Sequence, residues 1–491
     1  MTASAVPSVT STASNAAVGP RVRTRRGSEL FLLLLAMSIV TVYAAAVQYG
    51  ATRHLSTFWQ PPLLLTLVFL AAHVMVRFLA PYADPAILPA VALLNGIGLV
   101  FLRRIDLDPD MPDLDQHKNF IDFGAISFRQ LIWTIVAIVV ATVALIVVRD
   151  HRALSRYAYT LGLAGIVLMM IPAVLPASMS EVNGAKLWIK FGGFFQIQPG
   201  EFAKILVLSY FAYYLVRKRE VLSLASRRIL GIDFPRGRDL GPVLLVWVLS
   251  LMVLVFEKDM GTSLLYFGMF VVTLYIATER VSWLIIGLLL FFGGAFLAYV
   301  LGGTIGGPFA NFHQRVGVWL DPFADPNNNG YQLVQSLLGL GTGGLFGSGP
   351  GGGHPDQVPA VYNDFIFAGL GEEIGLFGLT ALLMVYLVIA ERGLRAAIAV
   401  RDSFGKLMAG GLAFTLALQV FVIVGGVTKL IPLTGQTTPF MSSGGSSLMA
   451  NWLLIALLLR ISDASRRPAT SGAPISSGPV KLAGLATEVV R

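Results

Sequence analysis

Long apolar stretches separated by shorter polar ones run through most of the chain. An α-helix needs about 17 to 25 apolar residues to cross a bilayer, and runs of that length predict twelve spans. They lie at 29–49, 61–80, 85–103, 128–148, 158–176, 200–216, 240–257, 261–278, 281–301, 367–391, 407–428 and 444–462. Membrane β-barrels have shorter, alternating segments. The pattern therefore predicts an all-α polytopic membrane protein with both ends on one side.

The polar segments divide the chain into four parts. Residues 1–28 and 464–491 are polar and lack apolar periodicity, so we expect disordered tails. The first two spans, within 29–82, contain no charge that the pattern assigns to a protein interior, which predicts an accessory hairpin facing lipid. The other ten spans, within 83–463, form the core.

Composition and charge support a membrane protein and fix its orientation. The chain is 55% hydrophobic and 13% charged, whereas charged residues make up about 25% of soluble proteins. More than twice as many of the 36 Lys and Arg residues fall on the side of the tails as on the other side. This asymmetry predicts cytoplasmic tails, and it accounts for the net charge of +9 without nucleic acid. Cysteine is absent, which excludes disulfides and thiolate chemistry.

The longest polar interruption, 302–366, is expected to face outward. It contains two Asp-Pro pairs, at Asp321 and Asp325, followed by a glycine-rich run at 339–353. Because the residue before proline avoids the helical region, each carboxylate is expected on a stiff turn. A polar, carboxylate-bearing loop of this length usually binds or reacts with something. The alternative for Asp325 is an aspartate that only forms the turn.

A second outward loop, after the third span, is acidic. It lacks the glycine and the terminal glutamate of an EF-hand, so we expect a solvated acidic surface rather than a calcium site. Its carboxylates are Asp106, Asp108, Asp110, Asp113 and Asp115.

A polar pair is expected where the sixth span begins. Pro199 and Gly200 suit the start of a helix, so Glu201 falls in its first turn, at the positive end of the helix dipole. Lys204 lies three residues on, on the same face. Two interpretations stay open: a capping glutamate with a lysine reaching the interface, or a functional pair at the outer mouth of the bundle.

The last outward segment, 429–443, contains prolines and is followed by paired glycines. Lipid cannot satisfy exposed peptide groups, so irregular backbone at this depth is expected to line a cavity. Its hydroxyl and N–H groups suit a phosphate or a sugar. A simple re-entrant turn is the alternative.

Six motifs in order along 83–463 resemble the SEDS family of bacterial cell-wall polymerases, which includes RodA and FtsW. They are Gln198-Pro199-Gly200-Glu201-Phe202-Ala203-Lys204, Asp259-Met260-Gly261-Thr262-Ser263, Leu320-Asp321-Pro322 through Asp325-Pro326 to Gly330-Tyr331-Gln332 with Gln335-Ser336, Asn363-Asp364-Phe365-Ile366-Phe367-Ala368, Gly371-Glu372-Glu373-Ile374-Gly375, and Pro439-Phe440-Met441-Ser442 with Gly444-Gly445-Ser446-Ser447.

The chain also departs from the family pattern at three places. Leu187, beside Lys186, stands where the family usually has arginine. Asn363 replaces the threonine of a His-Thr-Asp motif, with Tyr362 in place of its histidine, and Ser443 replaces a tyrosine. These variants and the two extra N-terminal spans look similar to actinobacterial members. Between the two kinds of protein, we expect a RodA-like rather than an FtsW-like one.

The resemblance implies an inverting glycosyltransferase that polymerises lipid II into glycan strands for cell elongation and cell shape. It would release undecaprenyl diphosphate at the outer face of the plasma membrane. The implied partner is a class B penicillin-binding protein transpeptidase. The alternatives are a lipid II flippase, an FtsW-like division polymerase, and a scaffold that only recruits the transpeptidase.

The resemblance also implies roles for individual residues. Asp325 corresponds to the family's catalytic aspartate and is expected to act as general base. Glu201 and Lys204 match its Gln-Pro-x-Glu motif, and Lys204 is the first choice of cation for the leaving diphosphate. The other substrate-binding candidates are Lys186, Arg315, Gln332, Lys429, Ser442 and Ser446. No metal cage is readable, so no cofactor is certain and a Mg²⁺ or Mn²⁺ requirement stays open.

Overall fold

The computed structural model describes most of the chain. The described residues are 24–111, 119–182, 185–191, 195–223, 225–229, 232–235 and 259–468, with Gly241, Leu245, Val248 and Met252. Contacts divide the chain into two units, one of residues Arg25–Arg466 and one of the chain ends, Met1–Thr24 with Arg467–Arg491. Every described helix and strand belongs to the first unit.

Long helices form the bundle, and each coincides with a predicted span. They are α1 (Arg26–Thr52), α2 (Gln60–Leu79), α3 (Ile87–Asp106), α4 (Ile126–Val147), α6 (Ala158–Val174), α8 (Pro199–Ser223), α10 (Met260–Thr278), α11 (Val281–Thr304), α14 (Ile366–Ala399), α15 (Ser403–Val427) and α16 (Gly445–Arg466). Among the described residues, 9 helices are long and apolar enough to cross a membrane. The expected helical multi-pass membrane protein is confirmed.

The predicted spans and tails differ from the described helices at three places. The predicted span at 240–257 lies outside the described residues, apart from four isolated positions. Helix α1 begins at Arg26 and α16 ends at Arg466, so both helices reach into stretches predicted as tails. The remainder of those tails, at 1–23 and 469–491, lies outside the described residues.

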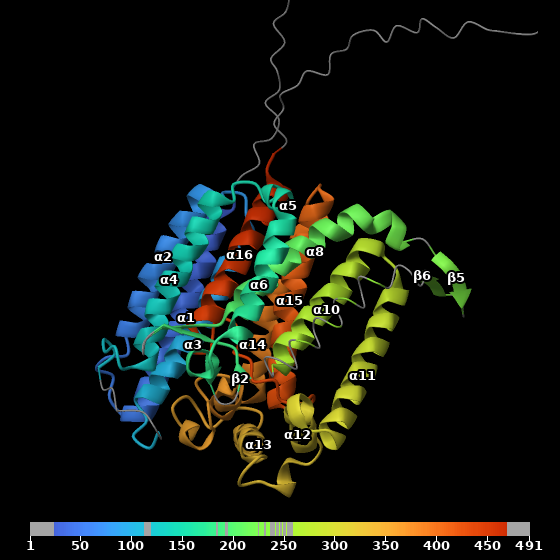
Figure 1. Cartoon of the computed structure of the whole chain (residues 1–491). Coiled ribbons are helices and arrows are strands. Elements are labelled where there is room, and N and C mark those ends of the chain that lie inside the picture. Colours follow the sequence, from blue (N-terminus) through green and yellow to red (C-terminus); the bar gives the residue numbers. More distant parts are fainter. Residues whose placement is uncertain are drawn as a thin grey trace, which may run out of the picture. The chain divides into compact units, whose positions relative to one another are not determined.

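Helices α3 and α16 form the centre of the bundle. In an apolar stretch of 18 residues, 94% of the residues are buried in α3 and 89% in α16, whereas 17% are buried in α11. Helix α3 packs against α1, α4 and α14, and α16 packs against α4, α8, α14 and α15. Figure 1 shows α11 at the side of the bundle, where it leads into α12.

The stretch 302–366 is more structured than the expected polar loop. It contains α12 (Ala310–Leu320), α13 (Tyr331–Gly343) and three 3-10 turns, η2 (Gly307–Phe309), η3 (Pro322–Ala324) and η4 (Pro355–Gln357). We call the end of the bundle that carries α12 and α13 the loop end (Figure 1), and the opposite end, where α1 begins and α16 ends, the tail end.

Short elements that the apolar pattern did not predict complete the described chain. They are α5 (Ala153–Arg156), α7 (Ala177–Ser180), and the antiparallel pairs β1 (Glu181–Val182) with β2 (Ala185–Lys186), β3 (Ile189–Phe191) with β4 (Phe195–Ile197), and β5 (Ala225–Ile229) with β6 (Ile232–Pro235).

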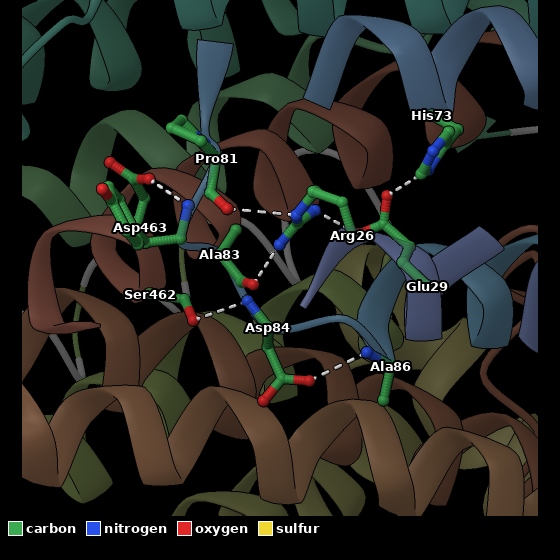
Figure 2. Close-up of polar contacts among 10 residues, drawn as sticks. Arg26, Glu29, His73, Pro81, Ala83, Asp84, Ala86, Ser462 and Asp463 are labelled. Atoms are coloured by element: carbon green, nitrogen blue, oxygen red, sulfur yellow. Dashed lines mark hydrogen bonds and ion pairs between the residues drawn. The ribbon is translucent and has the colours of Figure 1, made fainter. Parts of the chain in front are cut away.

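The expectation that the first hairpin contains no buried charge is wrong. Glu29 is 0% exposed and is bonded to Arg26 and, at 2.7 Å, to Nδ1 of His73 on α2. The Arg26 guanidinium also donates to the carbonyls of Pro81 (3.1 Å) and Ala83, in the connector to α3 (Figure 2). The sequence pattern does not predict this burial, because His73 and the Pro81 and Ala83 carbonyls lie far along the chain from Arg26 and Glu29. The hairpin is therefore joined to the core by buried polar contacts.

The prediction of a solvated acidic surface after the third span is also wrong for two of the carboxylates, Asp106 and Asp108. Asp106 is buried and accepts hydrogen bonds from the N–H groups of Ile126 (2.8 Å) and Ser127 (2.9 Å), at the start of α4. Asp108 is buried and pairs with Arg104 at 2.8 Å. Asp110 is exposed, and Asp113 and Asp115 lie outside the described residues.

Candidate functional site

Glu201 and Lys204 form a buried pair at the loop end of α8. The helix begins at Pro199, as expected, so Glu201 lies in its first turn. Lys204 Nζ donates to Glu201 Oε2 at 2.7 Å and to Gln419 Oε1 of α15 at 2.9 Å. The two side chains are only 6% and 5% exposed. The lysine is thus enclosed against α15 rather than exposed, which favours the functional pair over the interfacial lysine.

A second polar group caps the neighbouring helix. The Asp259 carboxylate accepts hydrogen bonds from the N–H (2.9 Å) and the hydroxyl (2.6 Å) of Thr262, at the start of α10. Gln436 Nε2 donates to the same hydroxyl at 3.0 Å. A Cβ at Gly261 would lie 2.5 Å from Cγ of Gln436, so glycine permits this approach.

Electrostatic interactions link these two groups. Burial raises the pKa of the Asp259 carboxyl, the Thr262 hydrogen bonds and the Arg315 charge oppose that rise, and the Glu201 charge adds to it. Gln419 also donates to the carbonyl of Thr437 at 3.4 Å. Residues from α8, α10, α12, α15 and the last loop therefore make one polar cluster, which consists of Glu201, Lys204, Asp259, Thr262, Arg315, Gln419 and Gln436.

Arg315 attaches α12 to the last loop and faces another aspartate. Its Nη1 donates to the Leu433 carbonyl at 2.9 Å. A Cβ placed on Gly435 would lie 3.7 Å from Nη1 of Arg315 and 4.0 Å from Oδ2 of Asp364. Burial raises the pKa of Asp364 to about 6, and the Arg315 charge opposes that rise. Sequence reasoning assigned Asp364 no role, although it stands in one of the quoted motifs.

Asp325 lies on the turn after η3 and is partly exposed. Its carboxylate accepts hydrogen bonds from Asn328 Nδ2 at 2.9 Å and from the Asn329 N–H at 3.2 Å. These bonds lower the pKa of Asp325. Within the described part of the chain, no hydrogen bond or ion pair joins Asp325 to the polar cluster. The structure therefore confirms the stiff turn but does not bring Asp325 into contact with Lys204.

The two candidate serines hold loops together. Ser442 Oγ donates to the Asn363 carbonyl and accepts from the Thr438 N–H at 2.9 Å. Ser446 Oγ accepts from the Gln198 N–H at 3.0 Å, close to the start of α8. Both hydroxyls thus bind backbone groups that shape the site.

The remaining substrate-binding candidates lie closer to the surface. Gln332 is exposed in the first turn of α13, and Lys186 and Lys429 are partly exposed. The Lys429 residue has a left-handed φ of 61°, and its carbonyl accepts a hydrogen bond from Trp319 Nε1 at 3.0 Å. These three residues do not join the polar cluster through any contact that the structure describes.

An apolar cavity of about 530 Å³ adjoins the cluster, between α10, α11, α12 and residues 430–434. Met260 follows Asp259 in the chain, and Pro432 and Thr434 flank Leu433, which binds Arg315. This cavity confirms that the irregular backbone after Lys429 lines a hollow. Its other walls are mainly aromatic and aliphatic and include Phe267, Phe292, Phe296, Tyr299, Phe312 and Trp319.

A metal site in a protein needs several acidic or histidine side chains close together. Within the described ranges, no group of three or more His, Asp or Glu side chains is arranged to hold a metal ion.

The fold and the site together define a class of protein: a multi-pass helical membrane protein with buried ionisable residues at one end of its bundle. Such residues are costly at membrane depth and generally serve function. A family model described as cell cycle protein, covering FtsW, RodA and SpoVE, matches residues 85–467. The chain belongs to this family, which confirms the resemblance drawn from the motifs.

Individual relatives support the same assignment. The chain is 49% identical to the peptidoglycan glycosyltransferase RodA of Mycobacterium tuberculosis over 477 residues, which is 96% of this chain and 97% of the relative. It is 48% identical to that of Mycobacterium leprae over 474 residues, with the same coverage. A probable peptidoglycan glycosyltransferase FtsW of a Geobacter species is 32% identical and covers 71% of this chain and 90% of the relative. The chain is thus more similar to RodA than to FtsW.

Solved structures share the fold. A variant of the rod shape determining protein RodA of Thermus thermophilus superposes with a TM-score of 0.51 at 23% identity, over 79% of this chain and 99% of that one. A structure described as the coordination of polymerization and crosslinking by a peptidoglycan synthase complex gives a TM-score of 0.51 at 24% identity. It covers 84% of this chain and 98% of that chain.

Proposed function

We propose that this protein is a peptidoglycan glycosyltransferase that polymerises lipid II into glycan strands for cell elongation. The observation that carries the proposal is a buried cluster of carboxylates and cations beside an apolar cavity, next to the loop that bears the paired Asp-Pro turns. The near full-length similarity to proteins named peptidoglycan glycosyltransferase RodA supports it.

The proposed orientation puts the tail end in the cytoplasm and the loop end outside. The excess of Lys and Arg on the side of the tails supports this orientation. Lipid II would then be used at the outer face of the plasma membrane. The amphiphilic character of the site suits such a substrate, because sugars and diphosphate need polar partners while the polyprenyl tail needs an apolar wall. The cavity beside α11 provides that wall.

The proposed reaction joins two lipid II molecules. A sugar hydroxyl of one attacks the anomeric carbon of the other, a C–O bond forms, and the bond to the diphosphate breaks with inversion. Asp325 takes the hydroxyl proton as general base, a step typically worth about 10²- to 10⁴-fold. Undecaprenyl diphosphate leaves with the electron pair. Lys204 and Arg315 are the cations of the polar cluster and are proposed to stabilise the leaving charge.

Glu201 is proposed to orient Lys204, since the two are bonded at 2.7 Å. Asp325 lies outside the polar cluster. Because the attacked anomeric carbon is bonded directly to the diphosphate, the proposal requires the Asp325 turn and the two cations to lie on opposite sides of that carbon when both substrates are bound. A Mg²⁺ or Mn²⁺ ion is a further candidate for the diphosphate, although the described side chains form no cage for it.

A class B penicillin-binding protein transpeptidase is the proposed partner. The similarity to a peptidoglycan synthase complex that coordinates polymerization and crosslinking supports this proposal. A polymerase at the outer face would deliver its strands where a transpeptidase acts.

The test is synthesis of glycan strands by purified protein from labelled lipid II, with and without a chelator. Strands appear as a ladder on a gel. Asp325→Ala is expected to abolish the ladder, because the hydroxyl loses its proton acceptor, while the variant still folds. A ladder made by Asp325→Ala at near the normal rate would exclude the proposed mechanism. A flippase would move lipid II across vesicles without any ladder, and a scaffold would do neither.

A further inference from the structure

Helix α1 lies outside the part of the chain that the family model matches, which begins at residue 85. It nevertheless packs along the buried helix α3. A Cβ placed on Gly96 of α3 would lie 2.4 Å from Cγ2 of Val40, so the two helices approach closely. The buried residues of α1 recur along one face of the helix from Leu33 to Val47. This helix is therefore part of the bundle rather than a loosely attached anchor.

The tail end of α1 is fastened to the core. Arg26 is 5% exposed and binds the Pro81 and Ala83 carbonyls, and Glu29 links it to α2 (Figure 2). The same connector is held from α16, because the Tyr82 N–H donates to Asp463 at 2.8 Å and the Asp84 N–H donates to Ser462 at 3.1 Å. A buried charge without these partners would be strongly unfavourable, so this attachment resists displacement.

The loop end of α1 contacts the glycine-rich segment 344–353. A Cβ placed on Gly50 would lie 2.2 Å from the Pro350 carbonyl oxygen. A Cβ on Gly351 would lie 2.9 Å from the Ala51 nitrogen and 2.9 Å from the Val47 oxygen. Real Cβ atoms do not come so near to backbone atoms. The two backbones therefore touch without intervening side chains.

The glycine-rich segment is in turn paired with the start of α14. The Ser348 and Gly349 N–H groups donate to the Glu372 (2.8 Å) and Glu373 (3.0 Å) carbonyls. The helix is broken at Gly375, whose φ is 66°, and the freed N–H of Leu376 donates to the Gly344 carbonyl at 3.0 Å. Contact with α1 thus reaches α14, which follows Asp364 in the chain by two residues.

A buried polar group reinforces this junction. Arg104 of α3 donates to the Gly353 carbonyl at 3.0 Å and pairs with Glu373 at 3.3 Å. Tyr43 of α1 is buried, and its hydroxyl lies near Glu373 and Arg104. Residues of α1, α3, α14 and the glycine-rich segment therefore meet at one place.

We propose that α1 is an intramolecular brace: attached to the core at Arg26, it holds the glycine-rich segment through Gly50 and thereby positions the loop end for polymerisation. Gly50 and Val47 are then positioning residues, not catalytic ones. The effect on polymerisation rests on the proposed function, whereas the effect on the segment does not.

The first test compares two glycine substitutions in α1 of the full chain in nanodiscs. Gly50→Ala puts a methyl group against the Pro350 carbonyl, whereas Gly27→Ala puts one where nothing lies within 4 Å. Overpacking of this kind destabilises the contact, so amide hydrogen exchange at Ser348 and Gly349 is expected to rise about tenfold or more in Gly50→Ala. Ladder synthesis is expected to fall with it. Gly27→Ala is expected to change neither.

A second pair of variants avoids any clash. Val47 is 1% exposed, whereas Val42 on the same helix is 71% exposed. Val47→Ala is expected to raise exchange in the glycine-rich segment severalfold, because a buried side chain is shortened next to the contact. Val42→Ala is the matched control and should behave as wild type. This pair keeps the test decisive if Gly50→Ala fails to fold.

Unchanged exchange at 344–353 in both Gly50→Ala and Val47→Ala would overturn the brace. Faster exchange with an unchanged rate of ladder synthesis would leave a structural contact and overturn the positioning role. A wild-type protein that made no ladder would contradict the proposed polymerase function. The exchange measurements would still show whether α1 holds the glycine-rich segment.

Discussion

Two aspartates on either side of α13 have pKa values that are shifted in opposite directions. The Asn328 and Asn329 donors lower the pKa of Asp325, while burial raises the pKa of Asp364 to about 6. A lowered pKa keeps a carboxylate ionised and ready to accept a proton, although it also makes a weaker base. A raised pKa marks a carboxyl group that gives up its proton reluctantly. The two residues are therefore suited to different tasks.

At the residue scale, Asn328→Ala is expected to raise the pKa of Asp325. The variant loses the hydrogen bond from Asn328 Nδ2, which lowers this pKa the most. A general base must be ionised, so activity falls as the pH drops through its pKa. The acid limb of the polymerisation pH profile should move to higher pH in the variant, measured as initial rates. Asn327→Ala, at an exposed neighbour, is the control. An unmoved acid limb would contradict the role of Asp325 as base.

Asp364→Asn is expected to stabilise the protein at neutral pH. The folded state holds the Asp364 proton up to about pH 6, whereas the unfolded chain loses it near the ordinary value. Stability therefore falls as pH rises between these two values, and above them the ionised group costs on the order of 1 to 3 kcal/mol.

Thermal unfolding in detergent measures this effect. The melting temperature of Asp364→Asn should exceed that of wild type at pH 7.5, and the difference should vanish below about pH 4, where both forms are neutral. Asp110→Asn, at an exposed carboxylate, should show no such trend. A gain that is independent of pH would point to packing rather than to ionisation.

At the element scale, the helices were predictable and the hairpin attachment was not. The thickness of the bilayer sets the length of a membrane-spanning helix, so an apolar run of that length predicts a span. Helices α8 and α15 could be placed from this pattern alone. Whether Glu29 is buried depends on Arg26, on His73 and on the connector at Pro81, and that connector is held by Asp463. No local pattern contains this information.

Glu29→Ala is expected to destabilise the protein strongly. It leaves Arg26 buried without its carboxylate, and breaking a buried pair typically costs about 3 to 5 kcal/mol. Glu391→Ala is the control, since Glu391 pairs with the exposed Arg395 at the surface and such pairs are worth about 0 to 1 kcal/mol. Thermal unfolding compares the two. Equal losses in the two variants would mean that the buried charges do not hold the hairpin.

At the scale of the whole molecule, the chain lacks cysteine, so single cysteines can report its orientation. Asn327→Cys lies on an exposed turn at the loop end, and Arg152→Cys lies at an exposed position of the opposite end. A membrane-impermeant maleimide added to intact cells should label the first and not the second. Both should react after lysis. The reverse pattern would put the candidate site in the cytoplasm.

The site was predictable only in part, because some of its residues come together only when distant parts of the chain meet in the folded molecule. The Glu201 and Lys204 pair follows from helix spacing, and the two Asp-Pro turns follow from proline chemistry. Asp259, Gln419 and Gln436 join the cluster only because α10, α15 and the last loop converge in space. Ser442 and Ser446 were predicted as substrate ligands from their hydroxyl groups, and the structure adds that both hydroxyls bind backbone groups.

The attachment of α1 at both ends makes its length and helical phase significant. Each added residue of an α-helix contributes a rise of about 1.5 Å and a rotation of about 100°. One residue inserted between Glu29 and Tyr43 would rotate Gly50 away from Pro350 by that angle while Arg26 kept its place. Insertions and deletions inside this helix are thus incompatible with both attachments at once, although its sequence on the lipid side is free to vary.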